Sequence, residues 1–187
     1  MFDPKRAALV AIDLQKGIIG MPIAPHPAAT VVANSTRLAE ALTRAGGTVF
    51  RVHVAFSAGG ADRLKQEVDQ AMAGWPRSPD WADFVPEVAA WPSALDIVKR
   101  QWGAVHGAEL DLQLRRRGLD TIVLTGVATN FGVEQTAREA WQHGYSVVVA
   151  EDATSSVSEA AHRFAVETIL PRISRVRSTE AILAALA

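Results

Sequence analysis

Two charged residues follow apolar segments of this chain and could form an ion pair at a catalytic site. Asp13 ends the apolar run at residues 7–12, and Lys99 follows the apolar pair Ile97-Val98. A buried carboxylate without a partner is costly, so Asp13 needs a cation or hydrogen-bond donors, and Lys99 is the candidate cation. If the two meet, each keeps the other charged, and apolar surroundings could raise the pKa of the acid toward general-acid work. The residues alone leave open the alternative that Asp13 caps a turn and Lys99 is solvated.

The segment TGVATNFGVEQTAREAW, residues 125–141, indicates a second part of the same site. Its first half has the composition of a buried strand that ends in a turn, and its second half has helical periodicity. Thr129 or Asn130 can cap that helix, and backbone N–H groups at its start would form an anion or oxyanion pocket. Gly132 occupies the helix start, where a nucleophile would be favoured, and it offers no side chain. The alternative is an ordinary strand-to-helix connection that contains a glycine.

The composition excludes several kinds of chemistry and partner. The 187 residues include no cysteine, which excludes disulfides, thiolate metal sites and thiol nucleophiles. The formal net charge of -1 gives no electrostatic case for a nucleic acid or an anionic membrane surface. No apolar run approaches the roughly 18 to 20 residues of a membrane span, and the run at residues 7–12 is too short for a signal peptide. We therefore expect a cytoplasmic protein whose partner is a small-molecule substrate.

Strands and helices alternate along the sequence and would position these residues. Apolar or β-branched runs predict strands at residues 7–13, 48–56, 96–101, 121–126, 146–152 and 173–177. Helical periodicity predicts helices at about residues 30–45, 108–117, 133–143 and 158–170, and a terminal helix from Ser178. This alternation predicts one α/β domain over residues 1–187. We expect a three-layer α-β-α sandwich, in which a mostly parallel sheet of about six strands carries helices on both faces.

The carboxyl ends of the strands in such a sheet are where ligands gather. Asp13, Lys99, the turn at residues 126–132 and Asp152 each end a predicted strand, so we expect them at one edge. The GxGxxG fingerprint is absent, which argues against a dinucleotide-binding Rossmann domain. Residues 57–94 interrupt the alternation and hold Trp75, Trp81, Trp91 and four prolines. A long insertion of this kind is expected to cover a site or to form an interface.

Three segments together resemble the isochorismatase-like hydrolase superfamily over nearly the whole chain. They are AIDLQKGI, IVKRQWGAVHGAEL and TGVATNFGVEQTAREAWQHGYSVVVAEDATSS, in this order and spacing. The resemblance implies a catalytic triad, in which Asp13 matches the acidic residue and Lys99 the lysine of the family. Gly132 matches the position at which most members carry a nucleophilic cysteine. Those members attack a carbonyl through a thiolate, which is impossible here, and nothing in the sequence places a base beside the hydroxyl of Thr129.

The same resemblance implies a second kind of chemistry. True isochorismatases hydrolyse a vinyl ether, and they also carry glycine at the cysteine position while they keep the aspartate and the lysine. Asp13 would then be the general acid, Lys99 would tune and orient it, and the helix start at Gly132 would hold an anionic group of the substrate. The turn at residues 128–130, Ala-Thr-Asn, resembles the amidase branch instead. A catalytically inactive relative that only binds a small carboxylate is the alternative, and a flavodoxin-like nucleotide binder is disfavoured.

Further residues are expected at the pocket from the resemblance and from their spacing. The expected substrate-binding residues are Gln15, Trp102, Val127, Ala128, Thr129 and Phe131. For the two aromatic residues, packing in the core is the alternative. Many members have a cis peptide bond in the turn, which would be Val127–Ala128 here.

The resemblance also bears on metals and on assembly. Nicotinamidases hold a metal with an Asp-x-His pair after the second strand, together with a further histidine. The corresponding segment here, VHVAFSAGG, has no such pair, so we expect no metal and no cofactor, and His53 is expected as a strand residue near the pocket. Family members are commonly dimers or tetramers. A homo-oligomer is therefore expected, to which residues 57–94 could contribute an interface or a lid.

Overall fold

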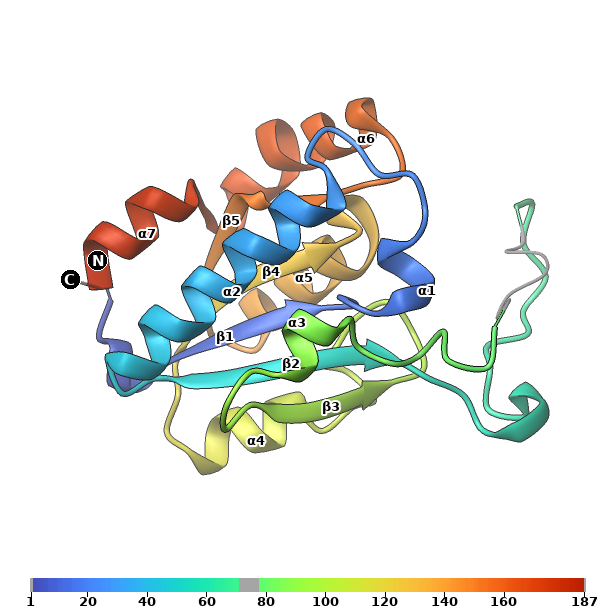
Figure 1. Cartoon of the computed structure of the whole chain (residues 1–187), viewed down its shortest axis with the longest axis horizontal. Coiled ribbons are helices and arrows are strands. Elements are labelled where there is room, and N and C mark those ends of the chain that lie inside the picture. The colour runs from blue at the N-terminus through green and yellow to red at the C-terminus, as the bar shows by residue number, and fades with distance from the viewer. Residues whose placement is uncertain (1, 71–77, 187) are drawn as a thin grey trace.

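A single parallel sheet forms the centre of the molecule, and it confirms the predicted α/β fold (Figure 1). The computed structural model describes residues 2–70 and 78–186. The strands are β1 (Ala7–Ile12), β2 (Thr48–Val54), β3 (Leu95–Lys99), β4 (Thr121–Val127), β5 (Ser146–Ser155) and β6 (Arg175–Arg177). They lie in the order β3-β2-β1-β4-β5-β6, and each neighbouring pair is parallel. Such pairing requires crossovers, which the intervening helices supply.

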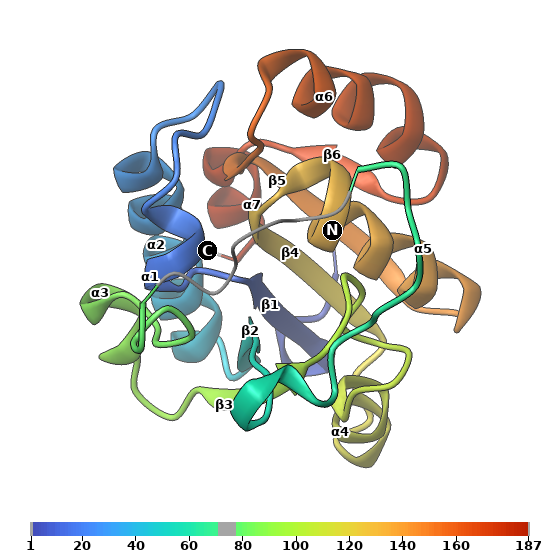
Figure 2. The ribbon, with the colours of Figure 1, turned by 90° about the vertical axis from the view of Figure 1, so that its right-hand side faces the viewer.

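Helices cover both faces of this sheet. They are α1 (Lys16–Ile19), α2 (Ala28–Arg44), α3 (Pro86–Ala89), α4 (Leu110–Arg116), α5 (Glu134–Gln142), α6 (Glu159–Phe164) and α7 (Thr179–Leu186). Figure 2 views the carboxyl ends of the strands and shows α2 on one side of the sheet and α4 and α5 on the other. All of β1 is buried: its even-numbered residues pack with α4 and α5, and its odd-numbered residues pack with α2 and α7. Burial on both faces is what a parallel sheet requires.

One strand end differs from the prediction. The fifth strand was expected to stop at Asp152, but β5 runs to Ser155. The register between β4 and β5 shifts between Leu124 and Gly126 of β4. The polar residues Glu151 and Asp152, which suggest the end of a strand, therefore lie inside β5. The Asp152 carboxylate binds the start of α7 instead, where it accepts hydrogen bonds from the backbone N–H and the hydroxyl of Thr179, both at 2.7 Å. Asp152 is therefore not part of the polar edge that includes Asp13.

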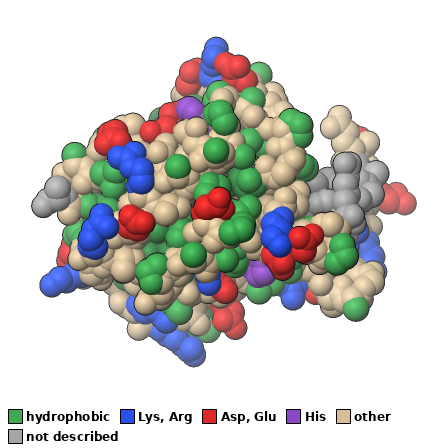
Figure 3. Space-filling model, viewed as in Figure 1, with side chains coloured by type: hydrophobic (Ala, Val, Ile, Leu, Met, Phe, Trp, Pro, Cys, Tyr) green, Lys and Arg blue, Asp and Glu red, His purple; other side chains and the backbone are tan. Residues whose placement is uncertain are grey.

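The surface formed by α2 and α7 carries charges of both signs. Figure 3 shows Lys and Arg side chains interspersed with Asp and Glu side chains on this face. Arg37 on α2 pairs with Glu180 on α7 at 2.6 Å, which links the two helices. Exposed pairs of this kind contribute little to stability. None of the helices in the described part of the chain has the length and apolar character that crossing a membrane requires.

Candidate active site

Asp13 and the turn at residues 126–132 lie on either side of the point at which the strand order reverses. The chain goes from β1 to β2 on one side, whereas β4 pairs with β1 on the other. The crevice at such a switch point is where open parallel sheets bind ligands. Gly126 lets the two strands approach closely, because its φ is 111° and a Cβ there would lie 1.9 Å from the Ile12 carbonyl oxygen. Strand order therefore brings the acid and the turn together.

The Asp13 carboxylate and the Lys99 ammonium group form a buried ion pair, with Lys99 Nζ 2.7 Å from Asp13 Oδ2. Lys99 ends β3, which is separated from β1 by β2, so its side chain reaches across one strand. The ammonium group also donates to the Gln101 carbonyl oxygen at 3.1 Å. The side chains of Lys99 and Asp13 are only 2% and 9% exposed, which excludes the alternative of a solvated lysine. The two residues therefore meet as the sequence predicts.

Burial raises the pKa of the Asp13 carboxyl above its ordinary value, although the charge and the hydrogen bond of Lys99 lower it. Asp13 Oδ2 accepts from Lys99, but the buried Oδ1 accepts no hydrogen bond from any residue that the structure describes. The nearby Val54 N–H, which also lowers the pKa of Asp13, donates to Gln15 Oε1 at 2.9 Å. An unsatisfied buried oxygen costs about 1–3 kcal/mol. Oδ1 is therefore the atom through which Asp13 can hold a proton or contact a ligand.

Gly132 faces the Asp13 carboxylate. A Cβ on residue 132 would lie 3.4 Å from Asp13 Oδ2 and 2.9 Å from Ile12 Cγ2. The residue lies in a π-helical turn, Thr129–Val133, that leads into α5. The expected cis peptide bond is present at Val127–Ala128, at the end of β4. Gly132 is itself buried, and a side chain at this position would point at the acid and press against Ile12.

The prediction that Thr129 or Asn130 caps the helix after this turn is wrong. Thr129 Oγ1 lies 2.8 Å from His162 Nδ1, and Asn130 Oδ1 accepts a hydrogen bond from Ser156 Oγ. Both side chains bind the segments that follow β5 rather than the backbone of their own helix. The sequence showed no base beside Thr129 because His162 lies 33 residues further on, and only the fold brings the two together. Thr129 is fully buried, so its hydroxyl is enclosed in this contact.

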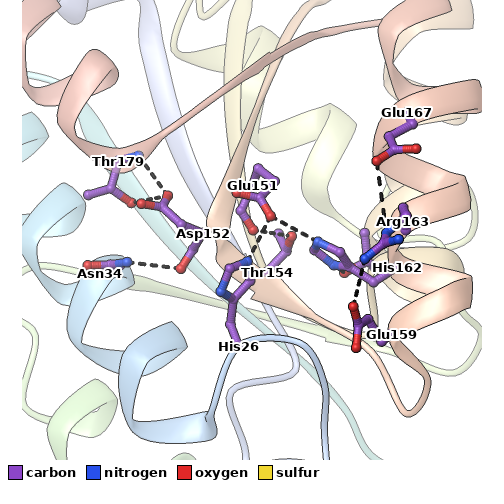
Figure 4. A network of polar contacts seen from close by, with 11 residues as sticks. His26, Asn34, Glu151, Asp152, Thr154, Glu159, His162, Arg163, Glu167 and Thr179 are labelled. Atoms are coloured by element: carbon purple, nitrogen blue, oxygen red, sulfur yellow. Dashed lines mark hydrogen bonds and ion pairs between the residues drawn. The ribbon is translucent and has the colours of Figure 1, made fainter.

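His162 belongs to a polar network around β5 that the sequence did not indicate (Figure 4). Its Nε2 and the Nε2 of His26 both contact Glu151 Oε1. Hydrogen bonds from His162 and His26 lower the pKa of Glu151 to about 2, although burial opposes this shift. The carboxylate therefore stays ionised, and the network supports the turn that holds Gly132 through the Thr129 contact.

Trp102 and Phe131 lie side by side next to Gly132, with their ring centroids 4.8 Å apart. They are 56% and 36% exposed, which excludes the alternative that they pack in the core. The Trp102 carbonyl oxygen lies 3.4 Å from the Cβ position of Gly132, which places this residue beside the acid. Val127 and Ala128, in contrast, have buried side chains that pack in the core. Any contact of these two residues with a substrate would therefore use their backbone.

Gln15 is fully buried and links the end of β2 to the insertion. Its Nε2 donates to the carbonyl oxygens of Val54 and Trp81, both at 3.1 Å, while its Oε1 accepts from the Val54 N–H. Lys16 adds ion pairs to Asp80 and Asp83 at 3.0 and 3.2 Å. The geometry therefore gives Gln15 a positioning role, in which it anchors the insertion over the segment next to Asp13. The predicted contribution of Trp75 lies outside the described residues.

His53 lies next to the insertion, on the strand that was predicted to hold it. His53 is a residue of β2, as predicted, and its Nδ1 lies 2.8 Å from the Ala82 carbonyl oxygen.

An open groove lined by Tyr145, Ser146, Ile173 and Arg175 lies at the amino ends of β5 and β6. This groove holds none of the predicted site residues. Because ligands bind at the carboxyl ends of parallel strands, we place the candidate site at Asp13 instead.

Comparison with known proteins adds to this geometry. A family model described as an isochorismatase domain matches residues 7–181, which include Asp13, Lys99 and Gly132. The chain is 48% identical to the uncharacterized isochorismatase family protein YecD of Escherichia coli O157:H7, over 98% of each chain. It is also 48% identical to the uncharacterized family protein YwoC of Bacillus subtilis strain 168, over 97% of this chain and 94% of that one. The solved structure of an isochorismatase family protein from Burkholderia thailandensis superposes with a TM-score of 0.95 at 42% identity, covering 100% of this chain and 97% of the other.

Proposed function

Because the chain belongs to the isochorismatase family, we propose that it is a hydrolase that acts on a small carboxylate-bearing substrate without a covalent intermediate. The observation that carries this proposal is the buried Asp13–Lys99 pair facing Gly132. The chain has no cysteine, so the thiolate attack used by most relatives has no nucleophile here. Acid–base chemistry with water is the route that these side chains support.

Hydrolysis of a vinyl ether suits this arrangement. Protonated Asp13, held at Oδ2 by Lys99, would transfer the proton on Oδ1 to the terminal alkene carbon, and the ether oxygen would stabilise the oxocarbenium ion that results. Water then adds to the carbon that bears this oxygen, and the proton it loses returns to the Asp13 carboxylate. The hemiketal then breaks the bond between this carbon and the former ether oxygen, its hydroxyl proton passes to that oxygen, and a ketone and an alcohol are released. No bond to the protein forms, so residue 132 needs no side chain.

Burial and Lys99 would act on the pKa of Asp13 in opposite directions. Burial raises the pKa of Asp13, which makes protonation of its carboxylate before the transfer less costly. The ammonium group favours the carboxylate, which lowers the cost of giving that proton up. The pair is therefore suited to an acid that must be regenerated in each cycle.

The substrate contacts are proposed from the surroundings of this pair. Trp102 and Phe131 would form an apolar wall for a planar unsaturated group. Backbone N–H groups at the start of α5 would bind the substrate carboxylate, because a helix N-terminus stabilises an anion. The backbone of Val127, Ala128 and Thr129 would line the pocket on the side of β4.

A panel of small enol ethers, esters and amides that carry a carboxylate tests the proposal. We expect release of a carbonyl product from an enol ether with the wild-type protein, and none with Asp13→Asn. Asp13→Asn should still bind the compound, since it keeps the size and shape of the side chain. Asp96→Asn is the matched control, because Asp96 is exposed on β3 and pairs with Arg51 away from the site. Equal activity of wild type and Asp13→Asn would exclude Asp13 from the mechanism.

A second candidate is a protein that binds such a ligand without turning it over. The burial of Asp13, which is only 6% exposed, favours this reading because it limits the access of water. Ligand-dependent thermal stabilisation with no product from any compound in the panel would select it.

We also propose that the protein is a homo-oligomer. The exposed rings of Trp102 and Phe131 form an apolar patch that a second copy could cover in part. Light scattering in solution tests this, and a mass equal to that of one chain would contradict it.

A further inference from the structure

His26, Glu151 and His162 place three metal-ligating atoms close together, apart from the proposed catalytic pair (Figure 4). Glu151 Oε1 lies 2.7 Å from His26 Nε2 and 3.1 Å from His162 Nε2. The two imidazole rings meet edge to face, with centroids 5.4 Å apart. The ligand atoms all lie within 4.8 Å of one another. Two imidazole nitrogens and a carboxylate oxygen therefore converge on one point.

Three separate elements hold this cluster in place. His26 lies in the loop between α1 and α2, Glu151 lies in β5, and His162 lies on α6. The loop is fixed to the end of β5 by an antiparallel bridge, in which Ala24 and Ser156 exchange backbone hydrogen bonds of 2.7 and 2.9 Å. The side chains of His26, Glu151 and His162 are 25%, 35% and 3% exposed. The cluster is therefore preorganised, and it is open to solvent on the side of His26 and Glu151.

We propose that His26, Glu151 and His162 bind a divalent first-row transition metal ion of the Zn²⁺ class. Two histidines and one carboxylate are a ligand set that zinc takes in proteins, with bonds of about 2.0–2.2 Å and a further position open to water. Ligands around a tetrahedral ion of that size lie about 3.3 Å apart. Side-chain rotations would bring the three atoms to this spacing: both contacts to Glu151 Oε1, at 2.7 and 3.1 Å, must open slightly, and the widest separation must close.

The two histidines can also adopt the tautomers that metal binding requires. In the metal-free protein, each ring can donate its Nε2–H to Glu151 Oε1. Metal binding requires both Nε2 atoms to be unprotonated, so each ring must carry its proton on Nδ1. For His162 the partner of Nδ1 is Thr129 Oγ1 at 2.8 Å, and a hydroxyl can accept as well as donate. Thr129 would therefore orient His162 in the metal-bound state, as outer partners of ligating histidines commonly do.

The cluster differs from the metal site of nicotinamidases, for which this sequence has no ligand pair. The expectation of no metal concerned an Asp-x-His pair after the second strand, in the segment VHVAFSAGG. His26 and Glu151 are 125 residues apart, so no spacing motif indicates the present site. Its contact with Thr129, in the turn that holds Gly132, gives the metal a structural link to the proposed catalytic pair.

Metal titration of the full chain tests this proposal independently of any hydrolase activity. The protein is treated with a chelator, dialysed and freed of any polyhistidine tag, and it is then titrated with Zn²⁺ and with Co²⁺. We expect one ion per chain by calorimetry, and a Co²⁺ visible spectrum typical of low coordination number. Mg²⁺, which prefers oxygen ligands, should not compete.

Variants separate this cluster from other histidines. His26→Asn should weaken Zn²⁺ affinity by at least about 100-fold, and Thr129→Val should weaken it by about 10–100-fold. His26 lies in a partly exposed loop, so its replacement should leave the fold intact, which circular dichroism checks. His143→Asn is the matched control, because His143 also contacts a carboxylate, that of Asp111 at 3.3 Å. Absence of stoichiometric Zn²⁺ and Co²⁺ binding, or equal affinity in His26→Asn, would overturn the proposal.

Discussion

Lys99 Nζ reaches Asp13 Oδ2 at 2.7 Å across the intervening strand β2, and both side chains are almost wholly buried. Replacing a buried ion pair by apolar residues is often neutral or stabilising, so stability alone does not explain why two charges stand here. Perturbed, desolvated charge pairs cluster at functional sites. The pair is therefore best understood through the chemistry it makes possible beside Gly132.

Lys99→Met should destabilise the fold by about 3–5 kcal/mol, because it leaves the buried Asp13 carboxylate without its cation. Urea-induced unfolding of wild type and variant measures this difference in the free energy of unfolding. The double variant Asp13→Asn/Lys99→Met should recover most of the loss, since neither charge then remains. A single variant as stable as the wild type would show that the two charges do not depend on each other.

Gly132→Cys should create a thiol beside Asp13 that reacts with iodoacetamide in the folded protein. The Cβ position of residue 132 faces Asp13 Oδ2 at 3.4 Å, on the side where we place the substrate. Ala137→Cys, on the helix α5 that follows this turn, is the control, because Ala137 is fully buried in the core against the sheet and its thiol should stay protected. Mass spectrometry after timed labelling measures both. A Gly132→Cys thiol as protected as that at residue 137 would place the pocket elsewhere.

Gln15→Met should loosen the insertion without changing the volume of the side chain much. The substitution leaves the Val54 N–H and two carbonyl oxygens without their buried partner, at about 1–3 kcal/mol for each unsatisfied group. We expect faster amide hydrogen exchange at Val54 and faster proteolysis between residues 57 and 94. Gln113→Met, at a partly exposed position of α4, is the control. Unchanged exchange at Val54 would contradict the positioning role of Gln15.

Glu151 should make the metal-free fold sensitive to acid. Its pKa is lowered from 4.5 to about 2, so its contribution to stability is present above pH 4.5 and is lost as the pH falls toward about 2. Glu151→Gln should therefore be less stable than wild type at about pH 7 and should lose less stability on acidification. Thermal unfolding at several pH values measures this, with the exposed Glu159→Gln as control. Parallel pH curves for wild type and Glu151→Gln would refute it.

The sequence was informative where burial produces a regular pattern. β1 and β4 are buried on both faces, so they appear as apolar runs, and a charged residue or a glycine-containing turn at their ends is conspicuous. Asp13 and the turn at residues 126–132 could be predicted for that reason. Lys99 could be predicted as the partner because the sequence offers few cations at strand ends.

The parts that escaped prediction depend on contacts between distant segments. β5 continues through Glu151 and Asp152, with a register shift against β4. The two polar residues resemble the end of a strand, so the sequence alone predicts that the strand stops there. Gln15 is buried because the insertion supplies its partner Trp81, 66 residues away. His26 and His162 meet only after the loop before α2 folds against the end of β5. None of these contacts has a local signature in the sequence.

Hydrolysis of an enolpyruvyl ether in D₂O tests the central role of Asp13 most directly, because vinyl-ether cleavage by this route requires proton transfer to carbon. With the wild-type protein we expect one solvent deuterium on the former terminal alkene carbon of the product, incorporated at a rate well above that of exchange into added product. Asp13→Asn should give neither product nor label. Product formed by wild type without deuterium at that carbon, or labelled product formed at the wild-type rate by Asp13→Asn, would contradict the account.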